Sequence, residues 1–262
     1  MNILFTICGR AGSKGFKNKN LKSFLGIPLV YYSVAAIALY IKSDSAKECN
    51  IDVVLNTDSE DLIGIVSKQK ELPIQAIRRE SSLGGDAVPK VSVIKDCLLK
   101  MEEYGKKNYD IVVDLDITSP LRTVQDIENA IEKKRLRKDT DVVFSVTESR
   151  RNPYFNMVKE ERGFFLKAIF SEYTARQQAP EFYDMNASIY AYSVIALKNK
   201  EPQIFFNDKC DAIFMKDTGI LDIDSEDDFQ MMQVIAEYLF NNDSGFREVY
   251  CKADEINNEI AL

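Results

Sequence analysis

Short apolar segments alternate with longer amphipathic ones along the first half of the chain. The short segments, rich in Ile, Val and Leu, cover residues 3–8, 51–56, 111–116 and 141–146. The longer ones have helical spacing and cover residues 29–41, 61–70, 88–104 and 124–136. This order predicts βαβ units in a mainly parallel sheet with helices on both faces. Ligands of such sheets bind beyond the carboxyl ends of the strands.

The alternation stops between Thr147 and Pro180. Two aromatic segments, residues 154–158 and 164–168, flank a polar turn at residues 159–163, which predicts a hairpin with exposed aromatic side chains. We interpret residues 147–180 as an inserted β-arm, and residues 1–146 with 181–245 as one α/β domain. Such an arm covers the site, forms a dimer contact, or does both. The polar residues after Phe246 are expected to fray.

Composition excludes several kinds of function. The net charge of -7 argues against nucleic-acid and anionic-membrane partners, which need a basic surface. Histidine is absent, which removes His triads, His metal ligands and imidazole bases. The 5 scattered cysteines form no CxxC pair and suggest neither disulfides nor zinc. The apolar start is too short for a signal peptide, and no segment approaches the ~20 residues of a membrane span, so we expect a cytoplasmic protein.

The segment Gly9–Lys22 contains five Lys or Arg residues and no acid, directly after the first predicted strand. Its glycines allow backbone N–H groups to approach phosphate oxygens, while the cations add positive charge. The spacing matches neither the P-loop nor the GxGxxG pattern. We interpret the segment as an anion-binding loop. The alternative is a solvated basic loop without a ligand.

Two pairs of alternating aspartates follow predicted strands. Asp222 and Asp224 point to one face of a short strand, an arrangement that suits a hard cation such as Mg²⁺. The alternative is a capping box at Ser225. Asp114 and Asp116 alternate at the end of another strand, where one of them could instead cap the next helix.

Several segments carry recognisable motifs: Gly9-Arg-Ala-Gly-Ser-Lys-Gly15 with Lys19-Asn-Leu21, residues 78–86, Thr118-Ser-Pro-Leu-Arg122, residues 176–190 and Leu221-Asp-Ile-Asp224. These motifs resemble those of the acylneuraminate cytidylyltransferases, the CMP-sialic acid synthetases. Asn152-Pro-Tyr-Phe-Asn-Met157 resembles the legionaminic acid branch. The resemblance implies a Rossmann-like fold of the nucleotide-diphospho-sugar transferase type. It implies transfer of CMP from CTP to the anomeric hydroxyl of a nonulosonic acid, with release of pyrophosphate, by a homodimer.

The resemblance also implies roles for individual residues. Lys19, Arg10 and Asp224 would be catalytic, with Asp222 and Asp224 holding Mg²⁺. Arg10, Ser13, Lys19 and Asn20 match positions that hold CTP phosphates, and Arg79 matches a nucleotide contact. The other substrate-binding candidates are Asp116, Thr118, Ser119, Arg122, Arg176, Gln177 and Asn186. Arginine suits the acid's carboxylate because its planar fork offers two parallel donors.

Two departures from the family pattern bear on the sugar. Asp116 replaces a glutamine that touches the sugar acid, and an anion there weakens recognition of a carboxylate unless a metal or a cation intervenes. Ala187 replaces a glycine. The alternatives left open are a cytidylyltransferase for another 2-keto sugar acid, such as Kdo or pseudaminic acid, a sugar-1-phosphate nucleotidylyltransferase, and a non-catalytic nucleotide-binding module.

Overall fold

The computed structural model describes residues 1–12, 15–85 and 87–260, with Arg176 described by its backbone alone. Its main sheet has 7 strands in the order β11-β7-β10-β6-β1-β4-β5. All pairings are parallel except those of β10, which runs antiparallel to β6 and β7. The strands are β1 (Asn2–Cys8), β4 (Asn50–Thr57), β5 (Ile74–Arg78), β6 (Ile111–Leu115), β7 (Val142–Glu148), β10 (Tyr183–Ser193) and β11 (Cys210–Phe214).

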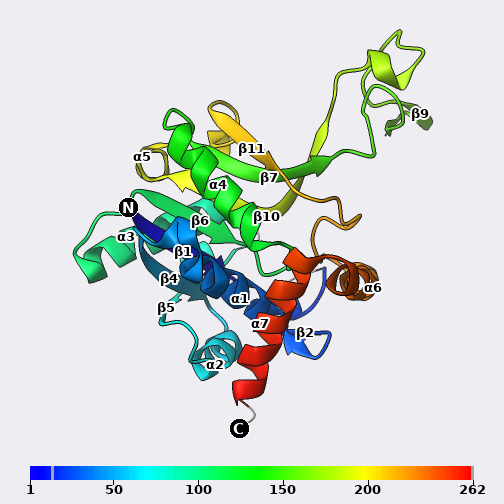
Figure 1. Cartoon of the computed structure of the whole chain (residues 1–262). Helices are drawn as coiled ribbons and strands as arrows, with labels where there is room; N and C mark the ends of the chain where they lie inside the picture. The colour runs from blue at the N-terminus through cyan, green and yellow to red at the C-terminus, as the bar shows by residue number, and fades with distance from the viewer. Residues whose placement is uncertain (13–14, 86, 261–262) are drawn as a thin grey trace.

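Helices cover both faces of this sheet, and two hydrophobic cores result (Figure 1). The helices are α1 (Leu29–Lys42), α2 (Glu60–Lys68), α3 (Lys90–Gly105), α4 (Val124–Leu136), α5 (Val194–Asn199), α6 (Glu226–Asn242) and α7 (Ser244–Ile260). Alternate residues of β1 divide between the cores: Ile3 and Phe5 pack with α1, whereas Leu4 packs with α3. Each such side chain contributes about 1.5–3 kcal/mol through burial. The predicted Rossmann-like fold is confirmed.

The C-terminal segment differs from its prediction. Residues 244–260 form α7, which packs against α1, instead of fraying. Phe246, Val249 and Ala253 are buried at helical spacing. Lys252 forms an ion pair with Glu71 at 2.8 Å, which ties the helix to the loop after α2. The polar composition concealed a narrow apolar stripe that is sufficient for docking. None of the helices that the structure describes is long and apolar enough to cross a membrane.

The predicted arm projects from the body of the molecule (Figure 1). Its hairpin pairs β8 (Val158–Glu161) with β9 (Phe164–Lys167) around a turn at Arg162 and Gly163, both with positive φ. A second small hairpin, β2 (Ser23–Phe24) with β3 (Ile27–Pro28), leads into α1. The short helix η4 (Arg176–Gln178) lies on the return path from the arm to β10.

The carboxyl ends of β1, β4 and β6 meet at one edge of the sheet, because these neighbouring strands are parallel. Strand β10 reaches the same edge from the opposite direction, and its register shifts between Met185 and Tyr190. Ala187 lies in this bulge with φ 55°, a conformation that favours glycine. The bulge therefore accounts for the glycine that the family pattern has at this position.

Candidate functional site

A pocket of about 690 Å³ opens at this edge of the sheet. It collects residues from the loop after β1, the segment after β5, the start of α3, the turn after β6 and the segment before α6. The predicted site residues that line it are Arg10, Lys19, Asn20, Arg79, Asp116, Thr118, Asp222 and Asp224. Segments that are far apart in the sequence thus converge as the motifs predicted.

The loop after β1 is anchored at its base by close packing. A Cβ at Gly9 would lie 2.7 Å from Leu62 Cδ2 and 2.9 Å from Ile117 Cδ1, so only glycine fits without displacement. Asn20 donates to the Arg10 carbonyl at 3.1 Å and closes the loop from within. Gly9 therefore serves packing, and its predicted role in approaching phosphate is not needed to explain it. Ser13 lies outside the described residues.

Lys19 joins the cationic loop to the acidic segment. Its Nζ lies 2.7 Å from Asp224 Oδ1 and 3.0 Å from the Ile223 carbonyl. The Asp224 side chain is 70% exposed, whereas that of Lys19 is 19% exposed. A Cβ at Gly15 would lie 3.0 Å from the Asp224 carbonyl, so the loop also touches the acidic segment through its backbone. The cation and the acid predicted to face the same triphosphate are therefore neighbours.

The acidic pair is separate from the helix cap that competed with it as an interpretation. The capping box of α6 exists, but Ser225 and Asp228 form it. Asp222 and Asp224 instead line the pocket. Within the described residues, no group of 3 or more acidic, Cys or His side chains could hold a metal alone. The pair suits Mg²⁺, which binds one or two carboxylates and takes its other ligands from substrate phosphates and water.

Burial raises the pKa of Asp222 to about 6, and the charges of Asp224 and Asp116 act in the same direction. The ionised form of Asp222 is therefore unfavourable in the folded protein, and a nearby cation would stabilise it. The donor set therefore fits a divalent cation: two carboxylates close enough to repel one another, in a pocket open to a polyanionic ligand.

Replacing Asp222 by asparagine is expected to stabilise the ligand-free protein in a pH-dependent manner. Because the folded pKa of about 6 exceeds the usual 3.8, the wild-type protein loses stability as pH rises through this interval. With ~1.4 kcal/mol per unit, reduced for partial exposure, we expect Asp222→Asn to be roughly 1–2 kcal/mol more stable at pH 7.5. Urea unfolding without Mg²⁺ measures this difference, which should vanish near pH 3.5. An equal difference at both pH values would contradict the assignment.

Arg79 lines the pocket beside β4. Its Nε donates to Asn56 Oδ1 at 2.8 Å and its Nη2 to the Asn56 carbonyl at 3.1 Å. Asn56 is fully buried at the end of β4 and donates to Asp96 of α3 at 3.3 Å. The guanidinium is thus held in a fixed orientation by the strand end.

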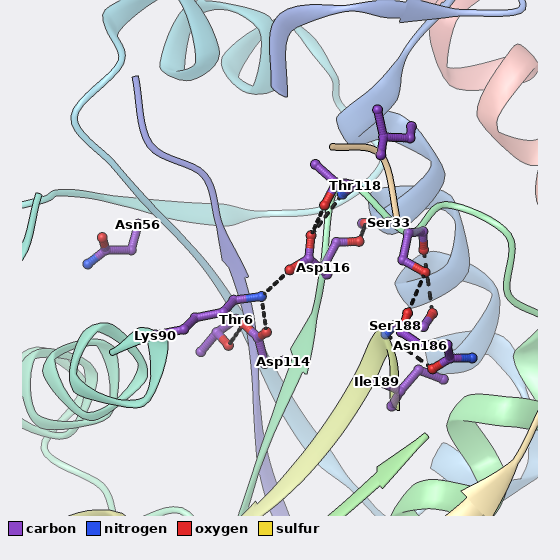
Figure 2. A network of polar contacts seen from close by, with 12 residues as sticks. Thr6, Ser33, Asn56, Lys90, Asp114, Asp116, Thr118, Asn186, Ser188 and Ile189 are labelled. Atoms are coloured by element: carbon purple, nitrogen blue, oxygen red, sulfur yellow. Dashed lines mark hydrogen bonds and ion pairs between the residues drawn. The ribbon is translucent and has the colours of Figure 1, made fainter. Parts of the chain in front are cut away.

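Lys90 is a pocket residue that the sequence motifs did not identify. It is the first residue of α3, and its Nζ lies 2.7 Å from Asp114 Oδ2 and 2.6 Å from Asp116 Oδ2 (Figure 2). Thr6 donates to Asp114 Oδ1 at 2.7 Å. Burial opposes the charge on Lys90, but the two aspartates raise its pKa well above its usual value. Asp116 therefore has a neighbouring cation, but it shares this cation with Asp114.

Arg122 has a different role from the one predicted. The side chain is fully buried and does not line the pocket. It donates to Ser188 Oγ at 3.0 Å, to Ser33 Oγ at 2.9 Å, and to the carbonyls of Asp116 and Ser119. Its donors are directed at the protein, so it positions the turn after β6 and does not contact substrate in this arrangement.

Ser119 and Asn186 are also buried beside the pocket and do not line it. Ser119 Oγ lies 3.1 Å from the carbonyls of Asn186 and Leu221. The Asn186 side chain accepts from Ser145 Oγ at 2.5 Å and donates to Met215 Sδ at 3.4 Å. These contacts bind the turn after β6 to β10 and to the acidic segment. Ser119 and Asn186, like Arg122, were predicted to contact substrate. In the structure they instead support the turn that lines the pocket.

The arm residues lie apart from the pocket within one chain. Gln177 is exposed and lines a separate cavity of about 420 Å³ with Asn152 and Phe182. Arg176 precedes it in η4, and the structure gives its backbone only. The projecting arm explains this separation, because it carries its residues away from the sheet edge of its own chain.

The sequence matches a known family over most of its length. The family profile described as cytidylyltransferase matches residues 4–206. Post-translational flagellin modification protein B of Campylobacter coli is 35% identical over 241 residues, which cover 89% of this chain and 94% of the relative. CMP-N,N'-diacetyllegionaminic acid synthase of Campylobacter jejuni is 34% identical with the same coverage. N-acylneuraminate cytidylyltransferase of Streptococcus agalactiae is 27% identical over 92% of this chain and 54% of its own length.

Solved structures agree in fold. CMP:2-keto-3-deoxy-manno-octonic acid synthetase, complexed with CTP, has a TM-score of 0.62 at 16% identity, covering 91% of this chain and 99% of that one. The 4-diphosphocytidyl-2C-methyl-D-erythritol synthase of Anaerococcus prevotii has a TM-score of 0.59 at 11% identity, covering 90% and 96%. With this architecture, and with relatives 34–35% identical over 89% of its length, the chain belongs to the cytidylyltransferase family and is a nucleotidyltransferase.

Proposed function

We propose that the chain transfers CMP from CTP to the anomeric hydroxyl of a nonulosonic acid and releases pyrophosphate. One observation carries the proposal: a cationic loop and an acidic pair, joined by the contact between Lys19 and Asp224, face one pocket on an otherwise acidic protein. A triphosphate needs the first, and a metal shared with its phosphates needs the second. The similarity to the legionaminic acid synthase, together with residues 152–157, favours a legionaminic-type acid.

The proposed reaction is an in-line attack of the sugar hydroxyl on the α-phosphate. Arg10 and Lys19 would neutralise charge on the triphosphate, and positioning with electrostatic stabilisation would supply most of the rate. Asp222 and Asp224 would hold Mg²⁺, which supplies charge stabilisation at the phosphoryl oxygens when bound. Arg176 and the other arm residues would act on the sugar acid only if the arm approaches a pocket.

The arm favours a homodimer as part of this proposal. Phe164, Phe165 and Phe170 are 72%, 71% and 85% exposed, and such large exposed aromatic side chains on one arm are unusual for an isolated chain. A second copy would cover them, and the arm would then reach a site other than that of its own chain. The protein would act in the cytoplasm, where CTP is available.

A pyrophosphate-release assay tests the function. The purified protein is incubated with Mg²⁺, one nucleotide and one acid, comparing CTP with ATP, GTP and UTP. The acids are N,N'-diacetyllegionaminic, N-acetylneuraminic, pseudaminic and Kdo acids. We expect release only with CTP, and fastest with the legionaminic acid. Preference for Kdo or pseudaminic acid would select the corresponding alternative, and absence of release with every pair would overturn the proposal.

A further inference from the structure

Lys90, Asp114 and Asp116 form a charge cluster in which one cation faces two anions (Figure 2). Asp114 is fully buried, and its carboxylate contacts Lys90 and the hydroxyl of Thr6. With Lys90 and both aspartates ionised, the cluster carries one net negative charge. It would repel a carboxylate or phosphate group, and Lys90 is therefore unsuited to bind the acid group of the substrate directly.

Asp116 offers the pocket a hydrogen-bond acceptor and no donor. Its Oδ1 accepts from the Thr118 backbone N–H and from Thr118 Oγ1, both at 2.8 Å, and its Oδ2 pairs with Lys90. Burial opposes ionisation, but Lys90 and these hydrogen bonds lower the pKa of Asp116 to about 2. A carboxylate has roughly four acceptor positions and no donor. Three are occupied, so what remains is an acceptor for a hydrogen-bond donor.

Asp116 lies beside the segment assigned to the metal. The turn that begins at Asp116 is joined to this segment, because the Ile223 N–H donates to the Thr118 carbonyl at 2.9 Å, and Asp116, Asp222 and Asp224 line one pocket. Asn56, which orients Arg79, lies on the other side of Lys90 in Figure 2. Asp116 therefore lies on the side of the pocket where we propose that the metal and the reacting phosphate bind.

We propose that Lys90 is a specificity-determining positioning residue, which holds Asp116 ionised and oriented to accept a hydrogen bond from a hydroxyl or acylamido N–H group of the sugar acid. This inference rests on the proposed function. Lys90 and Asp116 would together take the place that an uncharged glutamine amide holds in the family pattern. An ion-paired acceptor selects for a donor on the substrate, whereas an amide can pair with either a donor or an acceptor.

Charge balance gives a variant that distinguishes positioning from direct contact. Lys90→Met leaves two unpaired carboxylates and raises the net charge of the cluster to two negative charges. Adding Asp114→Asn to it restores one negative charge on Asp116, and the two hydrogen bonds from Thr118 to Asp116 Oδ1 still orient this carboxylate. If Lys90 acts through Asp116, the double variant recovers; if Lys90 touches the substrate, it does not.

Steady-state pyrophosphate release with Mg²⁺, CTP and N,N'-diacetyllegionaminic acid is the measurement. We expect Lys90→Met and Asp116→Asn each to raise KM for the acid by about tenfold or more, as for loss of one charged hydrogen bond, with KM for CTP within about twofold of wild type. The double variant should return KM for the acid to within about threefold of wild type. Lys100→Met is the matched control, because Lys100 lies on α3, pairs with Glu80 and Asp96, and does not line the pocket.

Three results would overturn the inference: a wild-type KM for the acid in Lys90→Met, a larger effect on KM for CTP than for the acid, or no recovery in the double variant. If Lys90→Met does not fold, Asp116→Asn and the double variant still decide it. A wild-type protein that releases no pyrophosphate with any of the legionaminic, N-acetylneuraminic and pseudaminic acids would instead refute the underlying function, which the same assay reveals before any variant is made.

Discussion

Replacing Asp224 by asparagine is expected to lower turnover with CTP and Mg²⁺ on the order of 10³-fold, because a metal ligand at a phosphoryl centre supplies several kcal/mol of charge stabilisation. The fold should survive. The Asp224 side chain is 70% exposed, and its pair with Lys19 is a surface interaction worth less than about 1 kcal/mol. Its backbone N–H, which donates to Asp228, is unchanged by the substitution.

The control is Asp227→Asn, the same chemical change on an exposed residue in the first turn of α6, outside the pocket. Initial rates over a Mg²⁺ titration separate weakened metal binding from a lost catalytic contribution. In the first case, a high Mg²⁺ concentration restores part of the rate. A variant as active as wild type at every Mg²⁺ concentration would remove the metal assignment.

The sheet and most helices were predictable because their apolar residues recur with the period of the element they form. The antiparallel direction of β10 was not, since its side chains alternate in the same way in either direction. Helix α7 was missed for another reason: Phe246, Val249 and Ala253 form its buried stripe among charged residues, and the overall polarity concealed the spacing. A search for helical spacing, made independently of mean hydropathy, would have found it.

The site was predictable where a motif marks residues that face the pocket, as for Lys19 and Asp224. The site was less predictable where the motif marks buried residues that hold the pocket-lining residues in place. Nothing in the sequence around Arg122 shows that its guanidinium points inward to carbonyl groups. Sequence shows which residues are neighbours along the chain, whereas the direction of a side chain depends on the packing of distant elements.

The sequence motifs missed Lys90, but the charges of Asp114 and Asp116 indicate that a cation lies near them. No local pattern marks Lys90, and its partner Asp116 is 26 residues away. The signal was the unbalanced pair Asp114 and Asp116 at a buried strand end, which requires a cation. A lysine or arginine at the start of a helix on the same edge of the sheet was the place to look for it.

Substituting Lys19 by alanine is expected to lower kcat by about 10²–10³-fold, the usual effect of removing one preorganised donor from a developing charge. Lys19 contacts both the Ile223 carbonyl and Asp224, so its charge is held at the junction of the phosphate loop and the metal segment. Alanine leaves Asp224 without this partner, and we expect KM for CTP to rise as well.

Lys17→Ala is the matched control for this prediction, since Lys17 belongs to the same loop and is exposed outside the pocket. If the loop acts only through its summed positive charge, both variants should lose activity equally, and the losses should shrink together as salt screens them. If Lys19 acts through its fixed position, its loss should exceed that of Lys17 by at least about tenfold at every ionic strength. Equal losses would therefore refute the proposal that Lys19 is a positioned catalytic lysine, but not the proposal that the loop binds CTP. The salt series separates the two mechanisms in one experiment.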